Sequence, residues 1–382
     1  MSITNENMRS NEDLIGRADA NDLEAIFAVK GYMEENGLHP VQDNCEALFT
    51  WDYEKGARTG LDKLYEKAKR QQWNGRTDLP WETEVDPEQE FYKFKEANPG
   101  LSVLDTSDLT GLCFEKWGEK EHLEFGIESQ KWTLSQFTHG EQGALLCTAK
   151  IVETVPWMDA KYYAATQVVD EARHVEVFSR YLEEKLGGMY ALNGHLGMLL
   201  DDIIDDSRWD MTYLGMQIMV EGLALAAFGF MHATTQEPLL KKLLRYVMAD
   251  EARHVAFGVL SLQEFYPSLT AAELRERQEF AFEAALRMRD RLMQQEVWEK
   301  MGVPVKDAIA LVDQDGGQKM FQTMLFSKIV PNCKKLGLLD AGDGWLRQKF
   351  TEIGVIMFED AEDTLNDEDV LAEESPVERN LV

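Results

Sequence analysis

The six-residue stretch DEARHV occurs twice in the chain, letter for letter and eighty residues apart. Residues three positions apart on an α-helix lie on the same face. Each copy therefore presents a carboxylate beside an imidazole, Glu171 with His174 and Glu251 with His254. Such a pair can bind one cation through an oxygen and a nitrogen. A single pair would mean little in a chain with 69 Asp and Glu residues, but an exact repeat carries weight.

Each copy also has a partner Glu thirty residues upstream, Glu141 before Glu171 and Glu221 before Glu251. A turn lies about midway in each case, at VPWMD and at TTQEP. Because a helix rises ~1.5 Å per residue, both members of a pair lie about 20 Å from their turn. They are thus at the same level of an antiparallel hairpin. The sequence predicts two equivalent helical hairpins, each with one Glu opposite one ExxH pair.

Two such hairpins, packed face to face, bring six candidate metal ligands to one level of a four-helix bundle. These are Glu141, Glu171, His174, Glu221, Glu251 and His254. Burying four carboxylates among apolar residues is costly unless cations compensate them, and two divalent ions do so. Mixed oxygen and nitrogen ligands suit iron or manganese better than structural zinc or calcium. We therefore expect two iron ions, with a manganese–iron pair as the alternative.

This pattern resembles the ferritin-like superfamily of di-iron carboxylate proteins, in which four helices hold two metals in this way. The repeated D-E-x-R-H is most similar to its oxygenase branch, such as the hydroxylase subunits of bacterial multicomponent monooxygenases and the benzoyl-CoA epoxidase type. The small subunit of ribonucleotide reductase is a cousin. The match covers about residues 135–265, and LYEKAKRQQWNGRTDLPW at 64–81 resembles a segment that precedes the core in some of these oxygenases. The resemblance implies an all-α, ferritin-like four-helix bundle with additional N- and C-terminal helices.

The resemblance also gives the other letters of DEARH a role. A metal-bound His usually donates its second N–H to a carboxylate, which fixes its tautomer. Carried over from the family, Asp250 would orient His174 and Asp170 would orient His254. The residues of this outer layer would be Asp170, Arg173, Asp250 and Arg253. The alternative is that these four side chains form ordinary surface ion pairs.

Three functions fit such a metal pair, and six matched positions disfavour a bundle whose buried Glu and His merely satisfy one another. The first is an oxygenase or oxidase that uses O₂ to hydroxylate, epoxidise, N-oxygenate or desaturate a small organic substrate. The second is iron oxidation and storage, but ferritins are usually short chains, and more than a hundred residues flank this core on each side. The third is a radical protein of the ribonucleotide-reductase type, which normally has a Tyr where this chain has Phe178. We favour the first.

We expect an apolar or aromatic substrate, because the residues beside the predicted metals are mostly small or apolar. The predicted pocket residues, each of which could equally be core packing, are Ala144, Leu145, Thr148, Phe178, Ala224, Leu225 and Phe228. An N-oxygenase of the p-aminobenzoate type is less favoured, since that family adds a His four residues before the last Glu ligand, where this chain has Val247. No dinucleotide-binding motif is present, so the electrons are expected from a separate reductase or from the substrate.

The composition excludes several other classes of protein. A net charge of −30 argues against nucleic acid and against anionic membranes as partners. The four Cys residues are far apart, which disfavours a zinc ribbon or redox pair and fits a reducing compartment. The N-terminus lacks the apolar stretch of a secretory signal. No apolar run is expected to reach the ~18 residues of a membrane span, and the nearest, YALNGHLGMLL, is too short. We expect a cytoplasmic homodimer.

The periodicity predicts core helices at 135–155, 159–186, 209–234 and 239–265. Flanking helices are predicted at 23–34, 45–70, 113–125, 271–301, 318–336 and 344–358, with a loop at 74–91 and a bridging segment at 189–206. We divide the chain into an N-terminal helical extension (1–134), a di-metal core (135–265), C-terminal helices that pack on the core (266–360) and an acidic tail (361–382). The tail and the first ten residues are expected to be loosely ordered.

Overall fold

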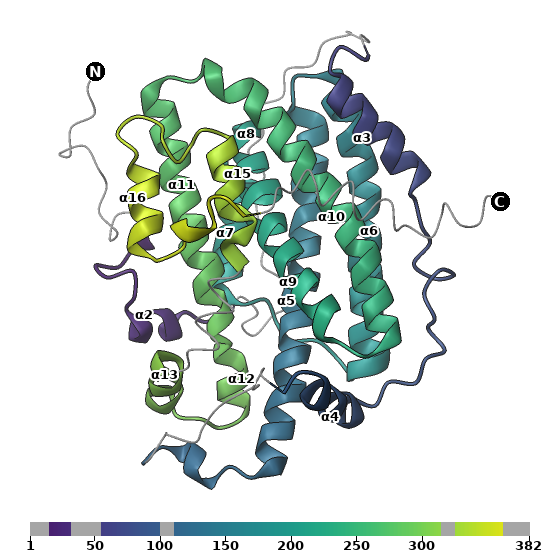
Figure 1. Cartoon of the computed structure of the whole chain (residues 1–382), viewed down its shortest axis with the longest axis vertical. Helices are drawn as coiled ribbons and strands as arrows, with labels where there is room; N and C mark the ends of the chain where they lie inside the picture. Colours follow the sequence, from purple (N-terminus) through teal and green to yellow (C-terminus); the bar gives the residue numbers. More distant parts are fainter. Residues whose placement is uncertain (1–14, 32–54, 100–110, 315–324, 362–382) are drawn as a thin grey trace.

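Four long helical segments run side by side along the molecule's longest axis in this computed structural model (Figure 1). They are α5 (Glu119–Thr154), α6 (Met158–Leu186), the run Trp209–Thr234 and α10 (Pro238–Phe265). The structure describes residues 15–31, 55–99, 111–314 and 325–361, and every regular element within them is helical. The predicted all-α four-helix bundle with added helices at both ends is confirmed. The acidic tail and the first ten residues lie outside the described ranges, and the division into four regions stays a prediction.

The ends of the core helices follow from local chemistry. Gly187 ends α6 in the left-handed conformation, with φ 71°, where a glycine pays no steric penalty. The carboxylate of Glu237 accepts hydrogen bonds from the backbone N–H groups of Leu239 and Leu240, at 2.7 and 2.6 Å, and so caps α10. Pro238 occupies the first turn, where its missing N–H costs nothing. Three of the four predicted core helices therefore begin and end within a residue or two of their predicted bounds.

The first core helix is the exception. The predicted start at residue 135 and the separate helix at 113–125 are both wrong, because α5 begins at Glu119 and runs unbroken through both ranges, preceded only by the short turn η2 (Cys113–Lys116). Gly126 does not interrupt it. A Cβ on Gly126 would lie 2.3 Å from the Phe91 ring, so this glycine lets α4 (Pro87–Ala97) pack closely against α5.

The third core helix contains a π-helical turn. It consists of α8 (Trp209–Tyr213), the π turn η3 (Leu214–Val220) and α9 (Glu221–Thr234), where the sequence predicted an ordinary helix. The run Trp209–Thr234 is long and apolar enough to cross a membrane, with a mean hydropathy of 1.6, so the expectation that no run reaches this length is wrong. Because 72% of its most apolar window is buried inside the protein, it is a core helix of the bundle.

The flanking helices depart from several predictions. The range 271–301 is interrupted, because α11 (Ala271–Asp290) passes into the turn η5 (Arg291–Met293), and Gln294 then takes a left-handed φ of 54°. Two predicted helices are shorter in the described residues, α2 (Leu23–Ala28) and α3 (Thr59–Arg70), and the predicted loop 74–91 already contains the start of α4. Helix α7 (Gly194–Asp205) lies inside the predicted bridging segment, and α13 (Val305–Gln314) was not predicted. The other described helices are α12 (Gln295–Lys300), α15 (Ile329–Lys335) and α16 (Trp345–Glu352). Three short turns complete the described part of the chain, η4 (Tyr266–Ser268), η6 (Leu325–Ser327) and η7 (Ile356–Phe358).

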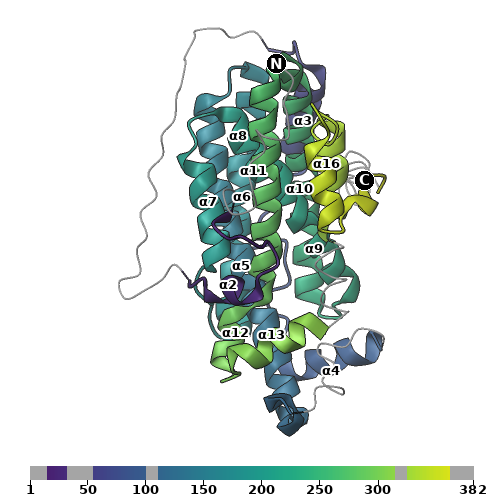
Figure 2. The same cartoon turned by 90° about the vertical axis from the view of Figure 1, so that its left-hand side faces the viewer.

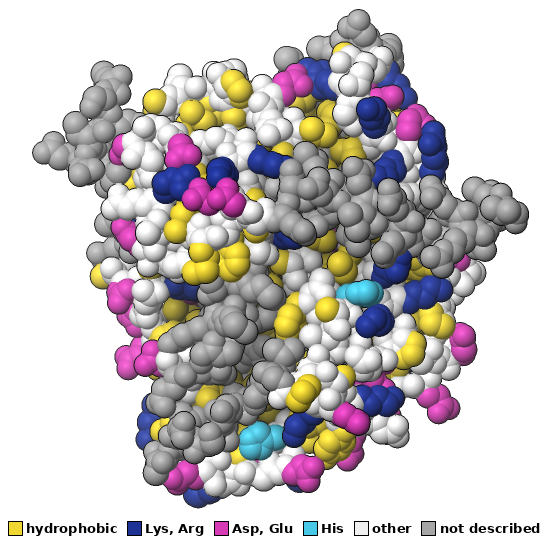
Figure 3. Space-filling view, in the orientation of Figure 1, with side chains coloured by type: hydrophobic (Ala, Val, Ile, Leu, Met, Phe, Trp, Pro, Cys, Tyr) yellow, Lys and Arg dark blue, Asp and Glu magenta, His cyan; other side chains and the backbone are white. Residues whose placement is uncertain are grey.

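The additional helices cover the bundle on different sides. Helix α3 packs against α6 and α10, whereas α11 packs against α7 and the π turn (Figures 1 and 2). Helices α2, α12 and α13 form a second apolar cluster with the start of α5 at one end of the molecule (Figure 2). On the face in Figure 3, the described Lys and Arg side chains are scattered among Asp and Glu.

Candidate metal centre

The six predicted ligand residues converge inside the apolar core. None of them is more than 5% exposed. Their ligand-type atoms form two groups, within each of which all atoms lie within 4.8 Å of one another. The groups are Glu141, Glu171, His174 and Glu251, and Glu171, Glu221 and His254. Each group could hold one metal ion, and Glu171 is common to both.

Both imidazoles turn Nδ1 toward the carboxylates. His174 Nδ1 lies 3.2 Å from Glu141 Oε2 and 3.1 Å from Glu251 Oε1. His254 Nδ1 lies 3.0 Å from Glu171 Oε1 and 3.4 Å from Glu251 Oε2. Each His therefore faces carboxylates of both hairpins, as two metal ions held between the hairpins would require.

Several buried atoms in this cluster have no hydrogen-bond partner among the residues that the structure describes. They are Oε2 of Glu171, Oε2 of Glu221, both carboxylate oxygens of Glu251, and Nδ1 of His254. A buried acceptor without a donor costs roughly 1–3 kcal/mol, so a cluster of them is unfavourable unless something else binds there. Carboxylate oxygens with one imidazole nitrogen per group are a donor set that fits iron and manganese. The residues present thus fit a di-metal cofactor.

The electrostatics of the cluster are those of concentrated negative charge. Burial and the neighbouring Glu251 hold the pKa of Glu141 well above its ordinary value, and burial and Glu171 do the same to the pKa of Glu221. Burial opposes charging of both imidazoles, yet the facing carboxylates outweigh it and raise the pKa of each well above its ordinary value. Metal ions compete with protons for these same oxygens and nitrogens.

The far side of each imidazole meets an aspartate from the opposite hairpin. His174 Nε2 lies 3.1 Å from Asp250 Oδ2, and His254 Nε2 lies 3.4 Å from Asp170 Oδ2. With Nε2 protonated and bonded to the aspartate, Nδ1 keeps its lone pair for a metal ion. The structure therefore places each predicted His–Asp pair within hydrogen-bonding distance.

The two arginines of the repeat join the aspartates into one network. Arg173 forms an ion pair with Asp170 and lies 3.0 Å from Asp250. Arg253 forms an ion pair with Asp250 and lies 3.6 Å from Asp170. All four side chains are buried, so they are not ordinary surface ion pairs. Two positive charges balance two negative charges, which lowers the cost of burying the network.

A segment just after α3 completes this outer layer, and sequence reasoning did not assign it a role. Trp73 Nε1 donates a hydrogen bond to Asp250 Oδ2 at 2.8 Å, and Gln72 Nε2 donates one to Asp170 Oδ1 at 2.9 Å. The side-chain oxygens of Gln71 and Gln72 accept hydrogen bonds from the two arginines, each at 2.8 Å. The resemblance of residues 64–81 to a segment of other oxygenases indicated that this region matters. It did not indicate that residues 71–73 contact the aspartates and arginines of the repeats.

Gln167 is a second residue that sequence reasoning missed. Its side-chain N–H group donates hydrogen bonds to Glu171 Oε1 at 2.9 Å and to Glu221 Oε1 at 3.0 Å. It lies one turn before Glu171, on the same face of α6. Its counterpart eighty residues later is Val247. Comparing the two copies beyond the DEARHV letters could have identified this position.

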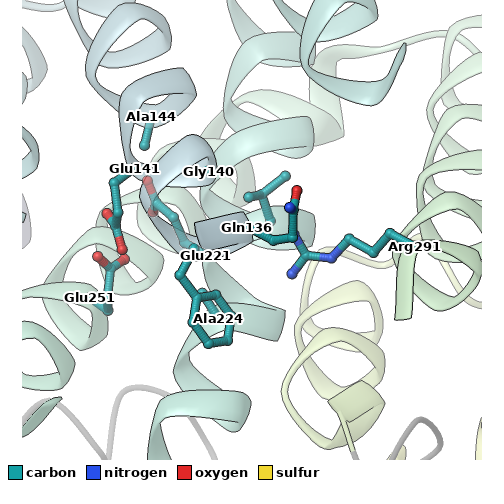
Figure 4. Close-up of a pocket in the computed structure, with 10 residues that line it drawn as sticks. Gln136, Gly140, Glu141, Ala144, Glu221, Ala224, Glu251 and Arg291 are labelled. Atoms are coloured by element: carbon teal, nitrogen blue, oxygen red, sulfur yellow. The ribbon is translucent and has the colours of Figure 1, made fainter. Parts of the chain in front are cut away.

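A small cavity lies beside the carboxylates (Figure 4). It is lined by Gln136, Phe137, Gly140, Glu141, Ala144, Val220, Glu221, Ala224, Glu251 and Arg291. Figure 4 shows Glu141 and Glu251 on one side and Gln136 and Arg291 on the other, with Glu221 between them.

Only two of the seven predicted pocket residues, Ala144 and Ala224, line this cavity. The five that do not are Leu145, Thr148, Phe178, Leu225 and Phe228. Phe228 packs on the wall residue Phe137, with 4.6 Å between ring centroids, and stacks on Phe178 at 5.6 Å, so both rings lie behind the wall. Thr148 is fully buried, and its hydroxyl does not bond back to its own helix.

Residues 148–337 match the family described as p-aminobenzoate N-oxygenase AurF. The matched range contains both DEARHV copies and also Val247, the position on which the sequence analysis disfavoured an N-oxygenase of this type. No curated protein matches the chain.

Two similar solved structures are point variants of an R2-like ligand-binding oxidase with a Mn/Fe cofactor, one reconstituted anaerobically and one aerobically. They are 18% and 17% identical to this chain, and each match covers 75% of this chain and 99% of the other, with a TM-score of 0.50. This likeness establishes the fold. Together with the family match and the convergent carboxylate–histidine cluster, it identifies the chain as a member of the ferritin-like di-iron oxygenase superfamily, an O₂-dependent di-iron oxidoreductase.

Proposed function

We propose that the protein is a monooxygenase that uses a metal pair and O₂ to oxidise a small organic molecule bound in the cavity. The observation that carries this proposal is that three of the proposed ligands, Glu141, Glu221 and Glu251, also form the cavity wall. A molecule in the cavity would lie directly beside the metals. When bound, the metal pair supplies the electrons for O₂ reduction.

The chain itself would bind, orient and shield. We propose as ligands Glu141, Glu171, His174, Glu221, Glu251 and His254. Asp170 and Asp250 would fix the imidazole tautomers, and the two arginines would hold both aspartates in place through ion pairs. Gln167 would hold Glu171 and Glu221 in position. The apolar wall residues would exclude water from the reacting end of the substrate.

Among the possible reactions, N-oxygenation of an aromatic amine is the first to test, because the matched family takes its description from p-aminobenzoate. Hydroxylation, epoxidation and desaturation are the other candidates. An iron pair is our first choice of cofactor, with manganese–iron as the second, in keeping with the Mn/Fe cofactor of the similar oxidases. We further propose that a separate reductase supplies electrons and that the protein works as a cytoplasmic homodimer.

The test is a single-turnover experiment on protein loaded anaerobically with Fe²⁺. We expect about two iron ions per chain, one reaction with O₂, and a second reaction only after reduction. Continued oxidation and accumulation of added iron well beyond two ions per chain would show storage instead. Product analysis with an aromatic amine, an alkene and an alkane then separates the possible reactions.

A cavity-filling variant connects this chemistry to the proposed site. Ala224→Phe should impair substrate oxidation while leaving metal content and the O₂ reaction intact, because Ala224 lines the cavity without offering a ligand atom. Ala226→Phe is the matched control, since Ala226 lies on the same helix but does not line the cavity. Equal turnover in the two variants would place the substrate elsewhere.

A further inference from the structure

Arg291 is an unusual residue to find in the wall of this cavity. It lies at the start of η5, where the long α11 ends, and its side chain is only 2% exposed. Figure 4 shows it reaching toward Gln136, on the side away from Glu141 and Glu251. The cavity therefore has a cluster of carboxylates at one end and a single buried guanidinium at the other.

This guanidinium has no partner within the described part of the chain. It forms no hydrogen bond or ion pair there, and its Nε atom is buried without an acceptor. Other buried arginines of the protein differ, because Arg173, Arg253 and Arg277 each form an ion pair with an aspartate. Gln136 does not accept a hydrogen bond from Arg291, because its amide is engaged elsewhere. Its N–H group donates to the Ala191 carbonyl and its oxygen accepts from the Asn193 backbone N–H group, each at 2.8 Å.

An uncompensated buried charge is expensive. Removing one partner of a buried ion pair is strongly destabilising, since the other charge is left without its counter-ion. Burial alone lowers the pKa of Arg291 to about 10, so the guanidinium still carries its charge at neutral pH. Such a group is retained at a stability cost where it binds something. A guanidinium presents a planar fork of N–H donors that matches the two oxygens of a carboxylate.

We propose that Arg291 binds a carboxylate group of the substrate and thereby selects small monoanionic molecules. The carboxylate would lie against Arg291, and the apolar body would extend along Phe137, Val220 and Ala224 toward the metal cluster. The reacting end is thus held at a fixed distance from the anchored end. That the end of the substrate near the metal cluster is the one oxidised rests on the proposed function. That Arg291 binds a carboxylate does not.

The test compares matched carboxylates and amides by calorimetric titration of the metal-loaded protein. The pairs are 4-aminobenzoate with 4-aminobenzamide, and hexanoate with hexanamide. In at least one pair the carboxylate should bind at least about ten-fold more tightly, which corresponds to about 1.4 kcal/mol. Arg291→Gln should abolish that preference. Arg287→Gln should retain it, since Arg287 lies near the end of α11, only four residues before Arg291, pairs with Glu283 at 2.7 Å and does not line the cavity.

Two outcomes would overturn the proposal. The first is the absence of a carboxylate preference in both pairs, and the second is a preference that persists in Arg291→Gln, which would mean that the carboxylate binds at the metals or elsewhere. Repeating the titration on metal-free protein separates this proposal from the previous one. If the protein takes up no metal, the proposed function fails, while an Arg291-dependent preference would still support the anion site.

A stability measurement distinguishes binding from a purely structural role. Because the guanidinium is uncompensated, Arg291→Met should leave the melting temperature of the ligand-free protein unchanged or raised. It should also remove the rise in melting temperature that the preferred carboxylate gives to the wild-type protein. A melting temperature several degrees lower in Arg291→Met, without ligand, would show that Arg291 stabilises the fold and would overturn the proposal.

Discussion

The two hairpins carry the same ligand-type residues at the same spacing, but they hold them differently. In the first, Glu141 lies within the unbroken helix α5. In the second, Glu221 directly follows the π turn η3. A π turn adds a residue to the helix and changes which side chains face inward after it, and such turns often occur at functional sites. An exact sequence repeat can therefore be built on two different backbones.

The surroundings of the two copies differ as well. Besides its ion pair with Arg253, Asp250 has three close partners, the Trp73 indole at 2.8 Å, Arg173 at 3.0 Å and His174 at 3.1 Å. Its counterpart Asp170 lies farther from the corresponding groups, 3.4 Å from the imidazole and 3.6 Å from the arginine of the opposite hairpin. Gln167 binds carboxylates in one copy, whereas the other copy has a valine at that position. The two metal positions are thus inequivalent despite the repeat.

The largest difference is expected from removing one imidazole at a time. His254→Ala leaves its group with only Glu171 and Glu221, whereas His174→Ala leaves three carboxylates. We expect His254→Ala to hold about one metal ion per chain and His174→Ala to hold a second ion weakly. Loss of a bound ion present at 100 times its dissociation constant removes ~2.7 kcal/mol of stability. Metal content after dialysis and thermal unfolding check this, and equal losses in both variants would contradict the inequivalence.

The aspartates give the next largest effect. Asp250→Asn and Asp170→Asn should keep the fold but weaken metal binding by roughly 10–100-fold, the usual cost of losing such a partner. Asp250→Asn should be the more severe, because Asp250 has the shorter contacts to its imidazole and to the arginine of the opposite hairpin. Metal titration with a competing chelator measures both. Unchanged affinity in both variants would mean that the network does not support the metals.

The Trp73 contact is specific to one copy and should matter less. Trp73→Phe removes the hydrogen bond to Asp250 and should lower the unfolding free energy by about 2 kcal/mol, since hydrogen bonds to charged groups contribute ~1.5–3 kcal/mol. Trp81→Phe is the control, because its indole donates to the uncharged Gly75 carbonyl, and the loss should be nearer ~1 kcal/mol. Urea unfolding of both variants gives the comparison, and a larger loss for Trp81→Phe would reverse it.

The smallest expected effect makes the two copies more alike. Gln167→Val gives the first copy the residue of the second and removes hydrogen bonds to Glu171 and Glu221. One such bond contributes ~1 kcal/mol, so the affinity for the second metal ion should fall by about five-fold. Thr166→Val is the control, because its hydroxyl bonds only to the backbone of Tyr163. Gln167 is not a positioning residue if both variants bind metal equally well.

The local part of this site was predictable from the sequence. Residues three apart on a helix and thirty apart around a turn have positions fixed by helix geometry, so six side chains could be selected without a structure. The hydrogen bond from Trp73 to Asp250 joins residues 177 positions apart, and no periodicity indicates it. Arg291 lay inside a predicted continuous helix, and no pattern in the sequence marked it as a residue of the cavity wall. The π turn likewise has no simple signature, because the residues of η3 are as apolar as those of an ordinary core helix.

The central claim is that the repeated hairpins hold two metal ions between them. Anomalous X-ray diffraction at the iron and manganese edges, on crystals grown from protein loaded with both metals, tests it directly. We expect two peaks per chain, one within the group that contains His174 and one within the group that contains His254. A single peak, a metal bound to other residues, or protein that takes up neither iron nor manganese would contradict it.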